Sequence, residues 1–366
     1  MVPIEEYERR ITSVLQVMER EGVDCLLLNR TNSIKYLTGA SNTCSWVFLT
    51  RSGRRIALVL ESDYLDYKSQ SILTDIRTHR PHDPVTHFAK LPKELGLKDG
   101  SMVVETDHLR VNQYLMLEKF FGSVLRKDLC ADTIVQEARM VKTPEEIECV
   151  RKAAQLGMLG MKVAKEGIAR GLTEVELARR VVDAMVAEGA DDNPLLYVAT
   201  DGRSSLAHNM PTRKKIEKGP VVLDIHVAYR GYHADIARTY FLEDPGNEQQ
   251  EAYSHFKEVV LRGIKTVKAG TTLVDARRFF HQSLQLREDW IPLFGPVLHG
   301  VGIMNRELPK FGHPWEGPGT PPRPLEANLT MAWGNVGLYS MKGWGIRYED
   351  TFLVTESDPV LFSVGD

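Results

Sequence analysis

The sequence contains little cysteine, no long apolar run and no excess of one charge. Its four cysteines stand apart without a C-x-x-C pair, which argues against a zinc ribbon or a disulfide framework. No segment approaches the roughly 18 consecutive apolar residues that a membrane span needs, and residues 1–6 lack the basic and apolar regions of a signal peptide. We therefore expect a cytoplasmic protein with free thiols and no membrane partner.

Charge and length narrow the class of protein further. Lys and Arg total 46 against 49 Asp and Glu, a net charge of -3, so no global charge favours a nucleic-acid partner. Apolar residues make up 43% and charged residues 26%, which excludes disordered and collagen-like chains. The 366 residues exceed one ordinary domain of about 100–200 residues, so two domains are expected.

The first part of the chain alternates between helical and strand patterns. Residues 4–22 carry apolar side chains at the three-and-four spacing of an amphipathic helix. Ser52-Gly53 marks a hairpin turn. The expected strands are residues 25–28, 46–49, 56–60 and 102–105. This pattern predicts a self-contained α/β domain over residues 1–135, without a reactive cluster.

The second domain is expected over residues 136–366, and a capping box lies near its start. In Thr143-Pro144-Glu145-Glu146, a Thr N-cap, a Pro at the first helical position and a Glu at the third predict a long helix running towards Ile168. A weak repeat comes next, because residues 171–180 resemble residues 270–278. Each copy has a helix, a Gly stop and a Thr cap with an acidic residue three positions later.

Two capping boxes can coincide by chance, but the strands that come after them argue for a repeat. Each copy leads into a glycine-interrupted pair of strands, residues 221–242 in the first and 329–355 in the second. Two helix–helix–hairpin halves of this kind predict a pseudo-twofold sandwich.

The first hairpin carries two aspartates among apolar residues. A buried carboxylate costs several kcal/mol unless a cation or strong donors compensate it. Asp224 and Asp235 on adjacent strands would repel each other, and a divalent cation between them is the simplest solution. Strand alternation places His226 on the face of Asp224. His226 is therefore either a third ligand or a hydrogen-bonded structural residue.

Two further residues extend this set. His299 stands between glycines that let other groups approach the imidazole closely, and Glu349 occupies in the second hairpin the place of Asp235 in the first. Oxygen ligands with one imidazole suit Mn, Co, Fe or Zn.

Together these motifs resemble the pita-bread-fold family, which includes aminopeptidase P, prolidase, methionine aminopeptidase and creatinase. The resemblance rests on the spacing of Asp224 and Asp235, on residues 299–302 and on residues 346–350. Residues 32–39 resemble the creatinase-type N-terminal domain. The resemblance implies an α/β (α+β) fold: a creatinase-type domain, then a pita-bread domain with a pseudo-twofold repeat. It also implies a homodimer.

The resemblance further implies site residues. Metal-dependent members hold two ions with two Asp, one His and two Glu. The positions that match are Asp224, Asp235, His299 and Glu349, and His208 matches an active-site His that binds and polarises the substrate. The cofactor implied is one or two divalent ions, or none if the site is incomplete.

Two positions depart from the family pattern. Gly334 begins the stretch where the first ligand Glu is expected, and Arg306 replaces a second catalytic His. His226 or a substrate carboxylate can fill the gap above Gly334. A guanidinium does not shuttle protons at neutral pH but grips a carboxylate through two hydrogen bonds. Arg306 is thus either a substrate anchor or a surface residue paired with Glu307.

Three functions remain open. The first is a Xaa-Pro peptidase-like hydrolase with an incomplete metal site, which cleaves a C–N bond of a small substrate or short peptide. Its catalytic residues are His208, Arg306 and Glu349, and Arg203 is either a substrate contact or an exposed loop residue. The second is a metal-free or single-metal enzyme of small molecules: a creatinase-like or ectoine-type hydrolase, or a dimethylsulfoniopropionate-type lyase. The third is a binding module without catalysis.

Overall fold

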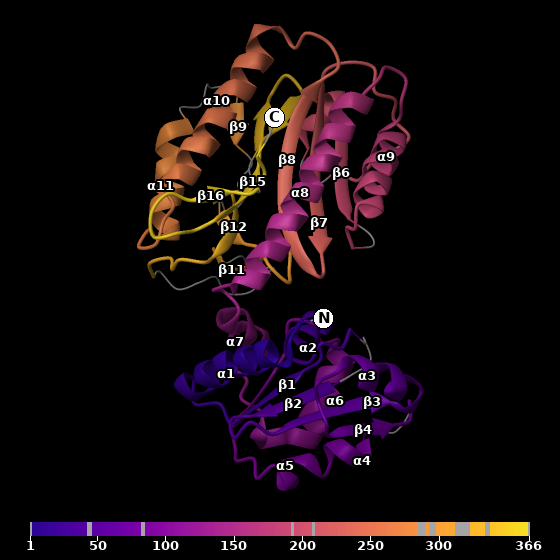
Figure 1. The fold of residues 1–366 in the computed structure, drawn as a ribbon, viewed down its shortest axis with the longest axis vertical. Coiled ribbons are helices and arrows are strands. Elements are labelled where there is room, and N and C mark those ends of the chain that lie inside the picture. Colours follow the sequence, from indigo (N-terminus) through magenta and orange to yellow (C-terminus); the bar gives the residue numbers. More distant parts are fainter. Residues whose placement is uncertain are drawn as a thin grey trace. The chain divides into compact units, whose positions relative to one another are not determined.

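The protein is described by a computed structural model (Figure 1). It covers residues 2–41, 46–81, 85–191, 194–206, 209–284, 290–292, 298–311, 323–333 and 337–364. The chain divides into two compact units, residues 1–139 and 140–366. The first unit includes all of helix α7 (Ala131–Ala138), which the expected domain limit at residue 135 would have divided.

A five-stranded mixed sheet forms the centre of the first unit. Its strands, in the order β4-β3-β2-β1-β5, are β4 (Ile76–His79), β3 (Arg55–Leu60), β2 (Trp46–Thr50), β1 (Cys25–Leu28) and β5 (Met102–Val104). The pairs β3–β4 and β1–β5 are parallel, and the other pairs are antiparallel. The four strands predicted from the sequence are confirmed as β1, β2, β3 and β5. The predicted turn is confirmed as well, since Gly53 takes a φ of +84° between β2 and β3.

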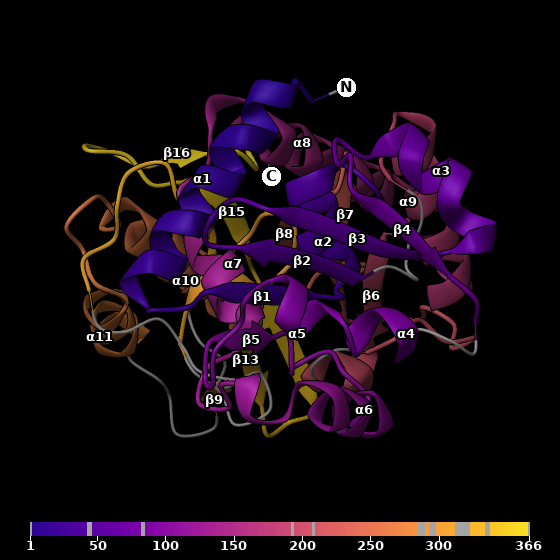
Figure 2. The ribbon, with the colours of Figure 1, turned by 90° about the horizontal axis from the view of Figure 1, so that it is seen from below.

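Helices cover both faces of this sheet (Figure 2). One face is covered by α1 (Ile4–Arg20), α2 (Thr31–Thr38) and α7, and the other by α4 (Val85–Phe88), α5 (Leu91–Glu94) and α6 (Val111–Phe121). The apolar stripe of α1 predicted over residues 4–22 is buried at Ile11, Val14 and Met18. On the opposite face, Phe88 packs against Phe48 and Phe121. These layers confirm the predicted α/β architecture.

The second unit begins with the predicted long helix. Helix α8 (Pro144–Gly167) is capped as expected, because Thr143 Oγ1 accepts from Glu146 N at 3.2 Å and Glu146 Oε2 accepts from Thr143 N at 2.9 Å. Helix α9 (Glu174–Ala187) comes next along the chain. The antiparallel sheet beside them has the order β6-β7-β8, with β6 (Leu195–Thr200), β7 (Pro220–Tyr229) and β8 (Tyr232–Phe241).

The second half of this unit repeats the two helices, and its hairpin is divided into two pairs of strands. The two helices are α10 (Gly246–Lys265) and α11 (Leu273–Leu284). The predicted cap lies at the start of α11, where Asp275 N donates to Thr272 Oγ1 at 3.1 Å. The strands form two sheets. The first is β11 (Glu307–Lys310), β10 (Leu298–Gly300), β12 (Thr330–Trp333), β15 (Asp350–Leu353) and β16 (Val360–Leu361), in this order. The second is β14 (Trp344–Arg347), β13 (Gly337–Ser340) and β9 (Trp290–Pro292).

These strands nevertheless form the expected interrupted pair, because β12 pairs with β15 and β13 pairs with β14, both antiparallel. The chain leaves β14 and pairs briefly with the first half before it enters β15. Glu349 N donates to Ala237 O at 3.0 Å, and Ala237 N donates to Glu349 O at 3.2 Å. This contact joins the two halves at the residue on which the expected site depends.

Helices flank the strands of the second unit on two sides. Figure 1 shows α8 and α9 beside β6–β8, and α10 and α11 beside the strands of the other half. Helix α8 lies so close to its sheet at Gly157 that a Cβ added there would meet Ile236 Cδ1 at 2.8 Å. Among the described residues, no helix combines the length and the apolar character needed to cross a membrane.

Candidate metal and active site

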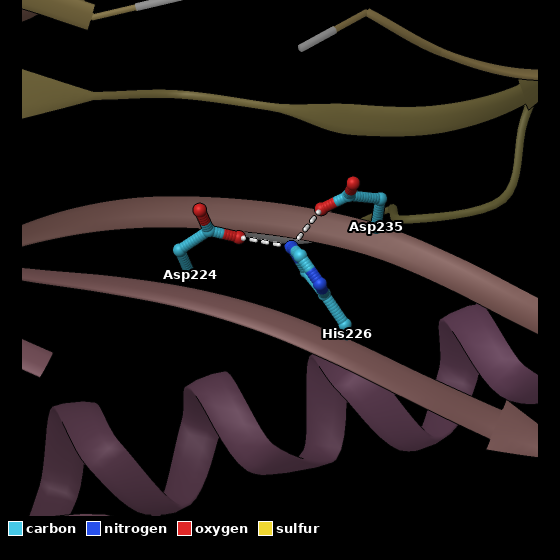
Figure 3. A group of neighbouring side chains, drawn as sticks. All are labelled: Asp224, His226 and Asp235. Carbon is cyan, nitrogen blue, oxygen red and sulfur yellow. Dashed lines mark ion pairs between the residues drawn. The ribbon is translucent and has the colours of Figure 1, made fainter. Parts of the chain in front are cut away.

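The hairpin of β7 and β8 brings three of the predicted site residues together. His226 pairs directly with Asp235 across the strands, and Asp224 pairs with Ala237. Alternation along β7 places Asp224 and His226 on one face, and Figure 3 shows the imidazole between the two carboxylates. The opposite face carries Ile236, which packs against α8. The expected placement of both aspartates and of His226 is thus observed.

Distances within this group are short. His226 Nε2 lies 3.3 Å from Asp224 Oδ1 and 3.4 Å from Asp235 Oδ1 (Figure 3). On the other side of the ring, Asn305 Nδ2 lies 3.1 Å from His226 Nδ1 and 3.1 Å from Asp235 Oδ2. Burial by itself would lower the pKa of His226, but the two carboxylates outweigh it and raise this pKa to about 9.

A second group shares Asp235 and adds His299 from β10 and Glu349. His299 Nε2 lies 3.7 Å from Asp235 Oδ2 and 3.9 Å from Glu349 Oε1. Its other nitrogen, Nδ1, lies 3.1 Å from the carbonyl oxygen of Gly300 and donates to it. Burial lowers the pKa of His299 to about 3, so the ring is neutral near pH 7. Nε2 therefore turns a lone pair, not a proton, towards two carboxylate oxygens.

Arg347, at the end of β14, lies between the two groups. Its Nη1 lies 2.5 Å from Asp224 Oδ2, and its Nη2 donates to Glu349 Oε2 at 3.3 Å. Burial opposes the charge of this guanidinium, but Asp224 and Glu349 raise its pKa. Sequence reasoning assigned no role to Arg347, although it lies in the motif of residues 346–350. Its position two residues before a candidate ligand was the available signal.

Each of the two groups brings three possible ligand atoms within 4.8 Å of one another, and the second includes a histidine that is neutral near pH 7. Asp235, His299 and Glu349 offer three electron-pair donors that lie within 4.8 Å of one another. His299 Nε2 has no hydrogen-bond partner among the described residues. Three buried acceptor atoms that face one another without a proton require a positive charge, and a divalent ion with oxygen and nitrogen ligands supplies it. This donor set fits one metal ion.

Arg306 follows Asn305, whose side chain donates to Asp235 of this set. The residue is partly buried, and its positive charge contributes to the lowered pKa of His299. Its neighbour Glu307 forms a buried ion pair with Lys142, with 2.8 Å between Nζ and Oε1. The sequence did not single out Lys142, because its partner is far away along the chain.

The remaining predicted residues divide into two cases. Arg203 Nε donates to Glu174 Oε1 at 3.1 Å, and Arg203 Nη2 donates to Met210 O at 2.8 Å. These contacts tie its loop to the buried start of α9, and a role in substrate binding stays a prediction. His208 and Gly334 lie outside the described residues, and so do the predictions made for them.

The glycines that follow His299 give room to neighbouring groups. A Cβ at Gly300 would collide with the backbone carbonyl group of Leu308, and a Cβ at Gly302 would collide with the Glu307 carboxylate. These glycines therefore allow β11 and Glu307 to approach β10, the strand that carries His299, closely.

Comparisons with known proteins agree with this architecture. Residues 148–356 match the model of Metallopeptidase family M24, and residues 10–141 match the Creatinase/Prolidase N-terminal domain. A Xaa-Pro dipeptidase of Pyrococcus furiosus is 25% identical over 353 residues, which cover 96% of each chain. A creatinase of a Bacillus species is 25% identical over 295 residues, which cover 74% of this chain and 69% of the relative.

A solved structure supports the same fold. The Xaa-Pro dipeptidase from Bacillus anthracis superimposes with a TM-score of 0.85 at 24% identity, over 98% of each chain. The family match spans more than half of the sequence. The chain therefore belongs to metallopeptidase family M24 and is a metallopeptidase-like hydrolase with the pita-bread fold.

Proposed function

We propose that this chain hydrolyses a C–N bond of a short peptide or small carboxylate substrate at a modified site that holds one divalent cation. The single observation behind the proposal is the lone pair of His299 Nε2, which faces Asp235 and Glu349 at 3.7 and 3.9 Å. The names of the relatives, Xaa-Pro dipeptidase above all, support a peptide ending in proline as the first substrate to test.

Each residue then has a chemical task. When bound, the cation would polarise a carbonyl oxygen and lower the pKa of a water molecule. Asp235, His299 and Glu349 would hold it, while Arg347 fixes the second oxygen of Glu349. Arg306 keeps the predicted role of gripping the substrate carboxylate, because a guanidinium binds a carboxylate through two hydrogen bonds. His208 keeps the predicted role of polarising the substrate.

Metal analysis combined with kinetics tests this function. Protein purified without chelator is assayed with Xaa-Pro dipeptides and with the same peptides as C-terminal amides, with and without Mn or Co. We expect cation-dependent hydrolysis and a lower kcat/KM for the amides. Arg306→Ala should remove this preference for the carboxylate, and Arg306→Lys should keep part of it. A cation content near zero, with activity unchanged by Mn or Co, would overturn the proposal.

A metal-free hydrolase of small molecules is the second candidate. Arg347 and His226 already place positive or donor groups against Asp224, so part of the acidic cluster is compensated without any ion. The creatinase among the relatives supports testing small C–N substrates as well. Turnover of such a substrate at full rate in the presence of a strong chelator would favour this candidate over the first.

A further inference from the structure

His226 stands where two buried carboxylates face each other. Its Nε2 lies 3.3 Å from Asp224 Oδ1 and 3.4 Å from Asp235 Oδ1, and Asn305 holds the far side of the ring. The two aspartate side chains are 1% and 2% exposed. At such burial each carboxylate needs a donor or a cation.

The contacts of Asn305 indicate which groups carry protons. Its amide nitrogen is 3.1 Å from Asp235 Oδ2, and a carboxylate accepts hydrogen bonds but does not donate them. Turning the amide would set its oxygen against that carboxylate, so the nitrogen side faces Asp235. The same nitrogen lies 3.1 Å from His226 Nδ1, which makes Nδ1 the acceptor and Nε2 the protonated atom of the neutral ring. A second proton, on Nδ1, would point at the amide nitrogen of Asn305, so this contact favours the neutral ring although the two carboxylates raise its pKa.

A protonated Nε2 has no lone pair for a metal. It lies instead at ion-pair distance from both carboxylates, 3.3 Å from Asp224 Oδ1 and 3.4 Å from Asp235 Oδ1. Arg347 Nη1 lies 2.5 Å from Asp224 Oδ2, so a nitrogen of the protein faces each oxygen of Asp224. The other oxygen of Asp235, Oδ2, lies 3.7 Å from His299 Nε2 and belongs to the group formed by Asp235, His299 and Glu349.

We propose that the Nε2–H group of His226 occupies the space between Asp224 and Asp235 in place of a second cation. The site then holds one cation, at Asp235, His299 and Glu349. This inference rests on the proposed function for that one cation, but it concerns a different pair of carboxylates. His226 is a positioning residue here, and Asn305 orients it.

Cation content provides the first test. The full chain is stripped with chelator, dialysed against excess Mn and analysed by elemental mass spectrometry beside four variants. We expect one Mn per chain in the wild type and in His226→Gln, whose amide keeps a donor between the carboxylates. His226→Ala should gain a second Mn and a larger Mn-dependent rise in Tm. His299→Ala should lose its Mn, and the exposed control His108→Ala should match the wild type.

The outcomes separate the two proposals. If the wild type binds two Mn and His226→Ala binds one, His226 is a ligand and the inference is wrong. The inference is also wrong if His226→Ala binds no more Mn than the wild type. No Mn in the wild type, but one in His226→Ala, would overturn the one-cation function and support the role of His226.

Nuclear magnetic resonance of ¹⁵N-histidine-labelled wild type gives a second test that does not depend on the folding of His226→Ala. The signals of His226 are identified by their loss in His226→Gln. The cation for this measurement is Zn, which is diamagnetic, and we expect Nε2 to carry a proton both without and with Zn. An unprotonated Nε2 in either state overturns the proposal.

Discussion

Arg238 Nη2 lies 2.7 Å from Asp350 Oδ1, and neither side chain is exposed. Arg238 belongs to β8 and Asp350 opens β15, so the pair connects the two halves of the second unit. Arg238 Nη1 also donates to the carbonyl oxygen of Glu349 at 2.8 Å. The same guanidinium therefore fixes the backbone that carries Glu349 close to the strand that carries Asp235.

Asp350→Asn should strongly destabilise the protein. The substitution keeps the shape of the side chain but leaves the charge of Arg238 buried without its counter-ion. Breaking one side of a buried ion pair costs about 3–5 kcal/mol. Urea unfolding at pH 7 measures the loss. The matched control is Asp183→Asn in the exposed pair with Arg179, where about 0–1 kcal/mol is expected. Equal losses in the two variants would contradict the role of Arg238 as a connection between the halves.

Gly300→Ala should lower both stability and cation affinity. The new methyl group would press on the carbonyl group of Leu308 and push β11 away from β10, which carries His299. Forcing extra atoms into a packed site costs about 1–3 kcal/mol. Unfolding curves and Mn titration measure the two effects. In the control Gly167→Ala, near the end of α8, the Cβ would meet only Leu177 Cδ1, at 3.9 Å, so neither quantity should fall. A Gly300→Ala protein with unchanged Mn affinity would contradict this account.

The hairpin of the site was predictable from local sequence. Asp224 and Asp235 lie on strands joined by a tight turn, so alternation and pairing decide which side chains share a face. The capping boxes at Thr143 and Thr272 were predictable for the same reason, because each involves residues only three positions apart.

Contacts between distant segments were not predictable in this way. Asn305 reaches His226 from a segment far along the chain, and no periodicity in the sequence reports such an approach. His299 was noticed for its neighbouring glycines and Glu349 as the counterpart of Asp235 in the second hairpin, and the family resemblance then gave both a role in the site. The interruption of the second hairpin has the same origin, because the chain around Glu349 pairs with Ala237 in the other half.

Glu105 should make the stability of the protein depend on pH. Its Oε2 accepts from the backbone nitrogens of Asn29 and Arg30, each at 2.7 Å. Burial nevertheless raises its pKa from 4.5 to about 7. The folded state then binds the proton more tightly than the unfolded state. Its stabilising contribution is complete below about pH 4.5 and disappears as the pH rises through 7. A shift of this size corresponds to about 3 kcal/mol.

Glu105→Gln tests that dependence. Unfolding by urea between pH 5 and 8 should show a smaller loss of stability with rising pH in this variant than in the wild type, because glutamine does not ionise. The exposed control Glu19→Gln should keep the slope of the wild type. If the slopes of all three proteins agree, the carboxyl group of Glu105 titrates alike in the folded and unfolded states and the prediction is wrong.

Lys142 and Glu307 should show strong coupling in a double-mutant cycle. Their charged atoms lie 2.8 Å apart, the side chains are 2% and 1% exposed, and Lys142 Nζ also donates to Met140 O at 2.9 Å. Lys142→Met or Glu307→Leu alone should cost about 3–5 kcal/mol, because each leaves a buried charge without its partner. The double variant removes both charges and should be more stable than the sum of the single losses predicts. Losses that add to within about 0.5 kcal/mol, as for independent sites, would show that the pair contributes no mutual stabilisation.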